Sequence, residues 1–206
     1  MAGLRRLRDG LPSRRHFLQH GFAAVAALIA VACSPSRPRS HRATTSVPAT
    51  RALGTPPGVT RIDAGPVEQV RATIASRRAP SYLPQARGYV SAFPADLAER
   101  ARGLYPTEVL PVLAEGLIVL HHGCPHLGCR VPFCTSSQWF ECPCHAAKFD
   151  RIGEYRAGPA PRGMTLYGAS IQNGRLVIDA GATFPGMPLG TNTTRQSAEG
   201  PACVGP

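Results

Sequence analysis

The sequence predicts an all-β fold, an antiparallel sandwich or barrel in which short strands carry long loops. Gly and Pro contribute 21 residues each, about a fifth of the 206, and this share argues against a helical bundle or a coiled coil. Short apolar runs alternate with turn-forming residues, and five of the seven cysteines lie close together between such runs. We expect the folded part to cover residues 61–190.

The first expected strand covers residues 67–74. Val70, Ala72 and Ile74 share one face in a period of two, which is typical of a half-buried strand. The chain that follows is expected to be irregular because three prolines interrupt it, at Pro80, Pro84 and Pro94.

A short helix is expected at residues 97–104, with Asp96 at its start. Residues 117–120 are a four-residue apolar run and predict a fully buried strand that ends at His121. We expect His121 and His122 to end this strand rather than to bind a metal.

A β-hairpin is predicted near the end of the folded part. Residues 165–171 and 175–178 have strand character, and Asn173 and Gly174 lie between them. An Asn-Gly pair suits the positive φ angles of a type I′ turn, so the two strands should pair with each other.

The net charge of +11 is concentrated at the N-terminus. The first 42 residues contain eight arginines and one acidic residue, Asp9, whereas residues 43–206 carry 15 basic and 11 acidic groups, a net +4. So modest a charge on the folded part gives no electrostatic footprint for a polyphosphate. We therefore expect no nucleic-acid partner.

Residues 1–33 have the layout of an export signal or membrane anchor. Arg14 and Arg15 precede Phe17 and Leu18, which resembles the twin-arginine consensus, and an uncharged apolar run follows. We expect export by the twin-arginine route, with the folded head on the extracytoplasmic side. That route is typical of proteins that receive a metal cofactor in the cytoplasm, so a cofactor is expected.

Three outcomes are open for this segment after export. Residues 17–32 would form a helix of about 24 Å, shorter than the ~30 Å hydrocarbon core. The segment can remain as a marginal anchor, be cleaved after residue 32, or be lipidated at Cys33, and two of these outcomes leave the protein on the membrane. Residues 34–60 predict a flexible linker rich in Pro, Ser, Thr and Arg, and residues 191–206 a loosely ordered tail.

Six candidate metal ligands fall in two short boxes, separated by the 12 residues 130–141. Each box contains two Cys and one His within a Pro- or Gly-containing turn, so the side chains can converge without support from a helix. The first box holds Cys124, His126 and Cys129, and the second holds Cys142, Cys144 and His145.

The two boxes, their spacing and the later Gly-Pro-Ala-Pro at 158–161 resemble the Rieske iron–sulfur family, in particular its disulfide-containing, quinol-oxidising branch. The resemblance covers residues 116–180. It implies a Rieske-type β-sandwich or barrel with a small cluster-binding part at residues 121–162 and one [2Fe–2S] cluster per chain. By resemblance, Cys124 and Cys142 bind one iron, and His126 and His145 bind the other. Histidine in place of cysteine raises the reduction potential of the cluster. The resemblance also implies that Cys129 pairs with Cys144 in a disulfide.

The resemblance also implies a function and partners. It suggests the iron–sulfur subunit of a quinol:cytochrome c oxidoreductase, with a cytochrome b-type subunit and a cytochrome c-type acceptor as partners. A quinol would hydrogen-bond to a cluster histidine, by resemblance His145, and His145 and His126 would be the catalytic ligands. The isolated chain is expected to be an electron carrier.

Three positions depart from the family pattern. Ala146, Ala147 and Phe149 occupy positions where quinol-oxidising members commonly have Gly, Ser and Tyr. The missing Ser and Tyr hydroxyls would donate to cluster sulfurs and stabilise the reduced cluster. We therefore expect a lower potential and a menaquinol donor.

Two other functions remain open. A Rieske small subunit of a periplasmic molybdenum oxidase, such as arsenite oxidase, would also use twin-arginine export and can also lack those hydroxyls. A zinc-stabilised exported binding module would need only four of the six ligands.

The sequence leaves the other cysteines unassigned. Cys134 lies between the boxes and Cys203 in the tail, and the two either form a second disulfide that straps the tail to the cluster-binding part or remain thiols.

Overall fold

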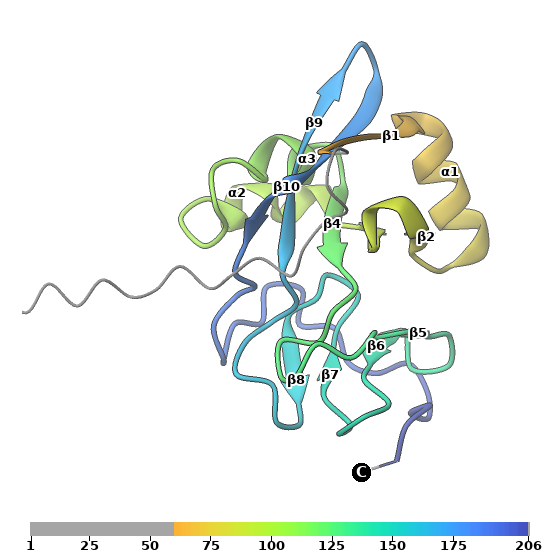
Figure 1. The fold of residues 1–206 in the computed structure, drawn as a ribbon, viewed down its shortest axis with the longest axis vertical. Helices are drawn as coiled ribbons and strands as arrows, with labels where there is room; N and C mark the ends of the chain where they lie inside the picture. The colour runs from red at the N-terminus through yellow and green to blue at the C-terminus, as the bar shows by residue number, and fades with distance from the viewer. Residues whose placement is uncertain (1–59, 206) are drawn as a thin grey trace, which may run out of the picture. The chain divides into compact units, whose positions relative to one another are not determined.

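The structure, a computed structural model, describes residues 60–205. In this range the chain forms two antiparallel sheets (Figure 1). The predicted export signal at residues 1–33, and all but the last residue of the predicted linker at 34–60, lie outside the described residues. Among residues 60–205, no helix is both long and apolar enough to cross a bilayer.

The fold is mostly β and antiparallel, as predicted. The larger sheet has six strands, in the order β1 (Arg61–Pro66), β10 (Arg175–Phe184), β9 (Leu166–Gln172), β4 (Leu117–His121), β3 (Gly88–Ala92), β2 (Ser81–Leu83). The smaller sheet has four strands, β5 (Phe133–Cys134), β6 (Trp139–Glu141), β7 (Lys148–Phe149), β8 (Tyr155–Ala157). The helices are α1 (Val67–Arg77), α2 (Ala98–Ala101), α3 (Leu110–Ala114) and the 3₁₀ turns η1 (Pro84–Ala86) and η2 (Ala95–Leu97).

Residues 122–164, here called the small lobe, leave the larger sheet and return to it at one place. Strands β4 and β9 pair at Leu120 and Leu166, and the His121 backbone N–H donates to the Thr165 carbonyl at 2.8 Å. In Figure 1 the small lobe extends beyond the end of β4. Its bounds lie close to the predicted cluster-binding part, residues 121–162.

The two sheets share one hydrophobic core. Tyr89 on β3 contacts Phe140 on β6, with ring centroids 5.0 Å apart. Leu120, Phe140 and Phe149 are fully buried in the same cluster of side chains. The apolar surface that they remove from water fixes the small lobe on the larger sheet.

The prediction of a strand at residues 67–74 is wrong, because this segment lies in helix α1. The buried residues of α1 are Val67, Val70 and Ile74, whose spacings of three and four place them on one helical face. Ala72 is exposed. Val70 and Ile74 fit a period of two and a period of 3.6 equally well, and the tertiary packing decides between them.

The prediction of an irregular stretch after α1 is also wrong, because β2 and β3 lie there. The three prolines fall beside these strands rather than inside them. Pro80 precedes β2, Pro84 begins η1 and Pro94 follows β3, so no ladder hydrogen bond is lost.

The expected helix at residues 97–104 is shorter than predicted. It comprises η2, which contains Asp96, and the single turn α2. Helix α3 was not predicted.

Two predictions near the sheet centre and its hairpin are confirmed. Strand β4 is buried throughout and ends at His121. Strands β9 and β10 pair through a turn in which Asn173 and Gly174 have φ angles of 50° and 72°, as a type I′ turn requires.

Candidate metal centre

The first ligand box is a closed loop between β4 and β5. The Cys124 N–H donates to the Cys129 carbonyl at 2.8 Å, and the Gly128 N–H donates back to the Cys124 carbonyl at 2.8 Å. Gly128 has a φ of 82°, a conformation that glycine adopts at little cost. These two backbone hydrogen bonds close the loop.

The second ligand box, between β6 and β7, repeats the same two hydrogen bonds. The Cys142 N–H donates to the Ala147 carbonyl at 2.8 Å, and the Ala146 N–H donates to the Cys142 carbonyl at 3.0 Å. Ala146 has a φ of 55° and occupies the place that Gly128 has in the first loop. A side chain in this left-handed conformation costs of order 1 kcal/mol, so the second loop is locally strained.

One disulfide joins the two loops. The structure pairs Cys129 with Cys144, the pair that the family resemblance implied. The Sγ atoms of Cys129, Cys142 and Cys144 lie within 4.8 Å of one another, but two of these sulfurs bond to each other. Only Cys142 of these three can therefore offer a thiolate to a metal.

Cys124 and Cys142 are free thiols and are buried, each with 2% of its surface exposed. Burial raises the pKa of the Cys124 thiol to about 11, and the hydrogen bond with Cys142 adds to the rise. The backbone N–H groups of His126 and Leu127, which donate to the Cys124 sulfur, lower this pKa. A thiolate pair at this site consequently needs a nearby positive charge. A bound metal would supply it, and metal coordination deprotonates such thiols outright.

His126 and His145 lie together at the tips of the two loops. Their ring centroids are 4.8 Å apart and their planes are nearly perpendicular, at 84°. His145 is exposed and His126 is partly exposed, whereas the two thiols are buried. The donor set is thus two sulfurs on the inside and two imidazoles on the outside, which fits a [2Fe–2S] cluster with two Cys and two His ligands.

A third loop covers the second box. A Cβ atom on Gly158 would lie 2.6 Å from the Ala147 Cα, so only glycine permits this close approach. The Tyr155 hydroxyl donates to the Gly158 carbonyl at 2.6 Å, and Ala160 is buried in the shared core. The Gly-Pro-Ala-Pro segment therefore packs directly on the ligand loop.

His121 and His122 make contacts outside the ligand set. The Gly123 N–H donates to His121 Nδ1 at 2.9 Å, and the Tyr82 hydroxyl is 3.1 Å from His122 Nδ1. Burial, followed by the charges of His122 and Arg87, lowers the pKa of His121 to about 4, which keeps this ring neutral. Both histidines lie at the end of β4, as expected.

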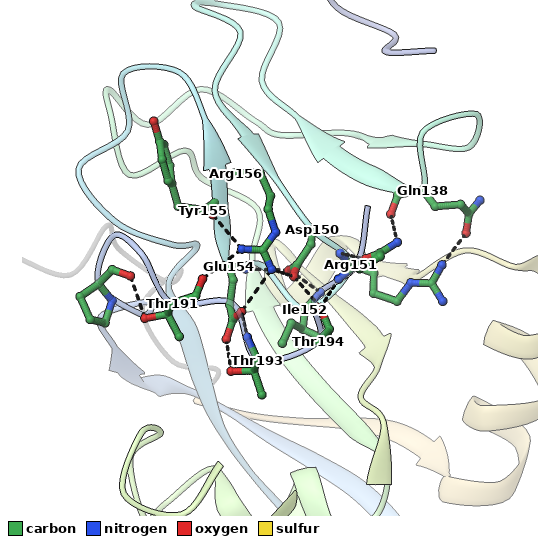
Figure 2. Close-up of polar contacts among 12 residues, drawn as sticks. Gln138, Asp150, Arg151, Ile152, Glu154, Tyr155, Arg156, Thr191, Thr193 and Thr194 are labelled. Atoms are coloured by element: carbon green, nitrogen blue, oxygen red, sulfur yellow. Dashed lines mark hydrogen bonds and ion pairs between the residues drawn. The ribbon is translucent and has the colours of Figure 1, made fainter. Parts of the chain in front are cut away.

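A buried ionic network supports the loop between β7 and β8 (Figure 2). Asp150 and Glu154 are 0% and 1% exposed, and the Arg156 guanidinium donates to both carboxylates. Backbone N–H groups of Ile152 and Glu154 donate to Asp150 Oδ1 at 3.1 and 2.9 Å. Charged side chains are usually solvated, and these two carboxylates can be buried because each one is paired with Arg156.

The network reaches outside the small lobe. The Tyr105 hydroxyl, between α2 and α3, donates to Glu154 Oε1 at 2.7 Å. The Thr193 hydroxyl donates to the same atom at 2.6 Å, and the Thr193 N–H donates to Glu154 Oε2 at 2.7 Å. No local pattern in the sequence indicated these contacts.

Replacing Ala146 by glycine should stabilise the protein. Ala146→Gly removes the cost of a side chain at positive φ, partly offset by the entropy of a more flexible unfolded chain, so we expect a gain of about 0.5–1 kcal/mol in the free energy of unfolding. Denaturant unfolding measures it. Ala147→Gly is the matched control, because Ala147 has no positive φ, and it should lower the stability of the protein. A loss of stability in both variants would contradict the strain inferred at Ala146.

The buried network should make stability depend on pH. Burial raises the pKa of Asp150 from 3.8 to about 6; the Arg156 charge lowers it and the Glu154 charge raises it. The folded protein holds the Asp150 proton more tightly than the unfolded chain does. The protonated carboxyl therefore adds to the free energy of unfolding in full below pH 4, and this stabilisation, about 3 kcal/mol at most, is lost as the pH rises through 6.

Thermal unfolding of Asp150→Asn and of the wild type at pH 4 to 7 tests this expectation. The variant has no proton to lose at this position, so its stability should fall less than that of the wild type across the window. Parallel stability curves for the two proteins would show that Asp150 does not titrate there.

Comparisons with known proteins agree with this geometry. The family model of the Rieske [2Fe-2S] domain matches residues 90–171. The chain is 40% identical over 55 residues to the cytochrome b6-f complex iron-sulfur subunit 1 of Nostoc sp. (strain PCC 7120 / SAG 25.82 / UTEX 2576), covering 27% of this chain and 31% of that protein. It is 31% identical over 97 residues to the cytochrome b6-f complex iron-sulfur subunit of Synechococcus sp. (strain WH7803), covering 45% and 54%. The chain thus spans about a third to a half of the length of these relatives.

Similar solved structures are also Rieske proteins. The soluble domain of the Rieske protein II (soxF) from Sulfolobus acidocaldarius matches with a TM-score of 0.40 and 16% identity, over 73% of this chain and 88% of that one. The plasma membrane Rieske protein PetC3 from Synechocystis PCC 6803 matches with a TM-score of 0.37 and 19% identity, over 57% and 97%. The sequence match and the Cys and His donors together show that the chain contains a Rieske [2Fe–2S] domain at residues 90–171.

Proposed function

We propose that this chain is the iron–sulfur subunit of a cytochrome bc-type complex, which takes an electron and a proton from a quinol and passes the electron to a cytochrome c-type acceptor. The observation that carries the proposal is the division of the six box residues. The disulfide uses Cys129 and Cys144, and it leaves Cys124, Cys142 and the two histidines. The two relatives described above are subunits of cytochrome b6-f complexes.

Four residues would hold the cluster: Cys124 and Cys142 through their sulfurs, and His126 and His145 through ring nitrogens. The bound cluster supplies the chemistry of one-electron uptake and release. His145 is exposed, so its free ring nitrogen can meet a quinol hydroxyl and hold the transferred proton. His126 is less exposed and would share this role to a smaller extent.

The surface next to His126 suits an apolar partner site. Leu127, at the tip of the first loop, is 70% exposed. Pro143, Pro159 and Pro161 are exposed on the second and third loops. An exposed apolar side chain at the electron-exchange end favours docking into a quinol pocket on a cytochrome b-type subunit.

The proposal includes a location and a donor. Residues 1–33 support export by the twin-arginine route and attachment to the membrane, with the head on the extracytoplasmic side. The departures at Ala147 and Phe149 support menaquinol as the donor. They equally suit a Rieske small subunit of a periplasmic molybdenum oxidase, which is the second candidate function.

Spectroscopy of fractionated cells tests cofactor and location together. The full chain is expressed, and washed membranes and the soluble fraction are titrated with ascorbate and dithionite under electron paramagnetic resonance (EPR). We expect a rhombic [2Fe–2S] signal in the membranes when ascorbate reduces the cluster. When the quinol site of the partner subunit is blocked, an added cytochrome c should oxidise the cluster again and remove the signal.

Each outcome of that experiment has a meaning. A colourless protein that contains zinc would overturn the cluster and the function. A signal in the soluble fraction alone would overturn the membrane attachment. A separate purification of the native complex distinguishes the two candidates: co-purification with a molybdopterin subunit, in place of a cytochrome b, would favour the second.

The reduction potential tests the assignment of the donor. Ala147 and Phe149 are both fully buried in the shared core, so hydroxyls placed there would be desolvated. The double variant Ala147→Ser/Phe149→Tyr should raise the midpoint potential by roughly 100 mV, taking about 1 kcal/mol for each hydrogen bond. Phe133→Tyr, which adds the same hydroxyl on β5, is the control and should leave the potential unchanged. A wild-type potential as high as that of Ser- and Tyr-containing members would contradict the menaquinol assignment.

A further inference from the structure

The C-terminal segment, residues 191–204, lies along the small lobe and is held at almost every step. It has no helix or strand, as its composition indicated, but it is not the loosely ordered tail that was expected. We call it the strap. Its first part binds the buried network through Thr193 and Thr194 (Figure 2), and in Figure 1 its end lies near β5 and β6.

The middle of the strap is fixed by polar contacts with the small lobe. Gln196 accepts the Arg151 N–H at 3.0 Å and donates to the Gln138 carbonyl at 3.2 Å. The Glu199 N–H donates to the Ser137 carbonyl at 3.0 Å, and its carboxylate pairs with Arg151 at 2.8 Å. As the strap advances, these contacts run back along the β5–β6 connection toward β5.

A covalent bond closes the strap. Cys203 forms a disulfide with Cys134 on β5, across a sequence separation of 69 residues. The Ser136 hydroxyl donates to the Pro201 carbonyl at 2.7 Å beside it. Of the two outcomes left open for these cysteines, the structure shows the second disulfide.

The strap ends on one buried carboxylate. Glu141 is 1% exposed, and its Oε2 accepts the backbone N–H groups of Cys203 and Val204 at 2.6 and 3.0 Å. Its Oε1 accepts the Ser137 hydroxyl at 2.6 Å. A carboxylate that is this deeply buried depends on such donors, and the strap supplies two of the three.

Glu141 immediately precedes the ligand residue Cys142. Its own N–H donates to the Pro132 carbonyl at 3.0 Å, and the Cys142 N–H donates to the Ala147 carbonyl at 2.8 Å. The chain at Cys142 is therefore fixed by backbone bonds on both sides and by the Glu141 side chain. A displacement of Glu141 would move the Cys142 sulfur relative to Cys124.

We propose that Glu141 is a positioning residue for Cys142, and that the strap, closed by the Cys134–Cys203 disulfide, holds Glu141 in place. This inference rests on the proposed function, because it takes Cys142 as a ligand of the cluster. Glu141 itself contacts no substrate. Although Glu141, Cys134 and Cys203 lie close together, both sulfurs are in the disulfide, so the group is a link between segments and not a second metal site.

The test compares two substitutions of Glu141 in the full chain. Glu141→Gln keeps one acceptor oxygen for the strap N–H groups, and its amide can face the Ser137 hydroxyl. Glu141→Ala leaves all three donors unpaired. We expect Glu141→Ala to shift the EPR g values and the midpoint potential and to shorten the lifetime of the cluster, followed by its visible absorption, about tenfold, whereas Glu141→Gln should restore most of each property. Glu68→Ala, an exposed site on α1, is the control.

A second variant keeps the inference testable if Glu141→Ala does not fold. Cys134→Ser/Cys203→Ser leaves Glu141 intact and removes only the covalent closure, so it should shift the g values in the same direction and by a smaller amount. Wild-type spectra and lifetime in this variant, or unchanged g values and potential in Glu141→Ala, would overturn the positioning role. Absence of a [2Fe–2S] signal from the wild-type protein would instead overturn the proposed function, so the two failures are distinguishable.

Discussion

The Cys129–Cys144 disulfide is the interaction on which the rest of the site depends. It leaves two of the four box cysteines as thiols, and it joins two loops that are each closed by their own backbone hydrogen bonds. Both loops use the same pair of backbone bonds, with a left-handed residue at the same place. The disulfide locks these similar loops face to face, so that thiols lie inside and imidazoles outside. This order would suit an electron carrier, because a bound metal would be shielded and an exposed ligand could meet a redox partner.

The small lobe buries its acidic groups. Glu141, Asp150 and Glu154, the three acidic residues in 122–164, are each no more than 1% exposed. Each carboxylate accepts several hydrogen bonds, so burial does not leave it unpaired. The donors come from the strap, from Tyr105 in the α2–α3 connection and from the lobe itself. The lobe has only short strands, and these polar contacts act together with its buried apolar side chains to give it a single arrangement around the ligand loops.

Local chemistry made much of this arrangement predictable. The two boxes, the Asn-Gly hairpin and the buried strand β4 each depend on residues within a few positions of one another, and all three are present in the structure. The strand predicted at residues 67–74 failed because Val70 and Ile74 satisfy two periods at once, and only the packing of α1 on the larger sheet selects the helix. Strands β2 and β3 were missed because the flanking prolines were interpreted as interruptions, when they in fact mark the strand ends.

The sequence by itself determined the ligand types, their spacing and the turns that carry them, because soft donors in two short loops are a property of the local chain. Only the tertiary structure decided that Cys134 pairs with Cys203 and which acids are buried. Cys203 meets Cys134 across 69 residues, and Tyr105 and Thr193 reach Glu154 from opposite directions along the chain. Such contacts form only where the folded backbone brings distant segments together, and a pattern of neighbouring residues does not predict which segments meet.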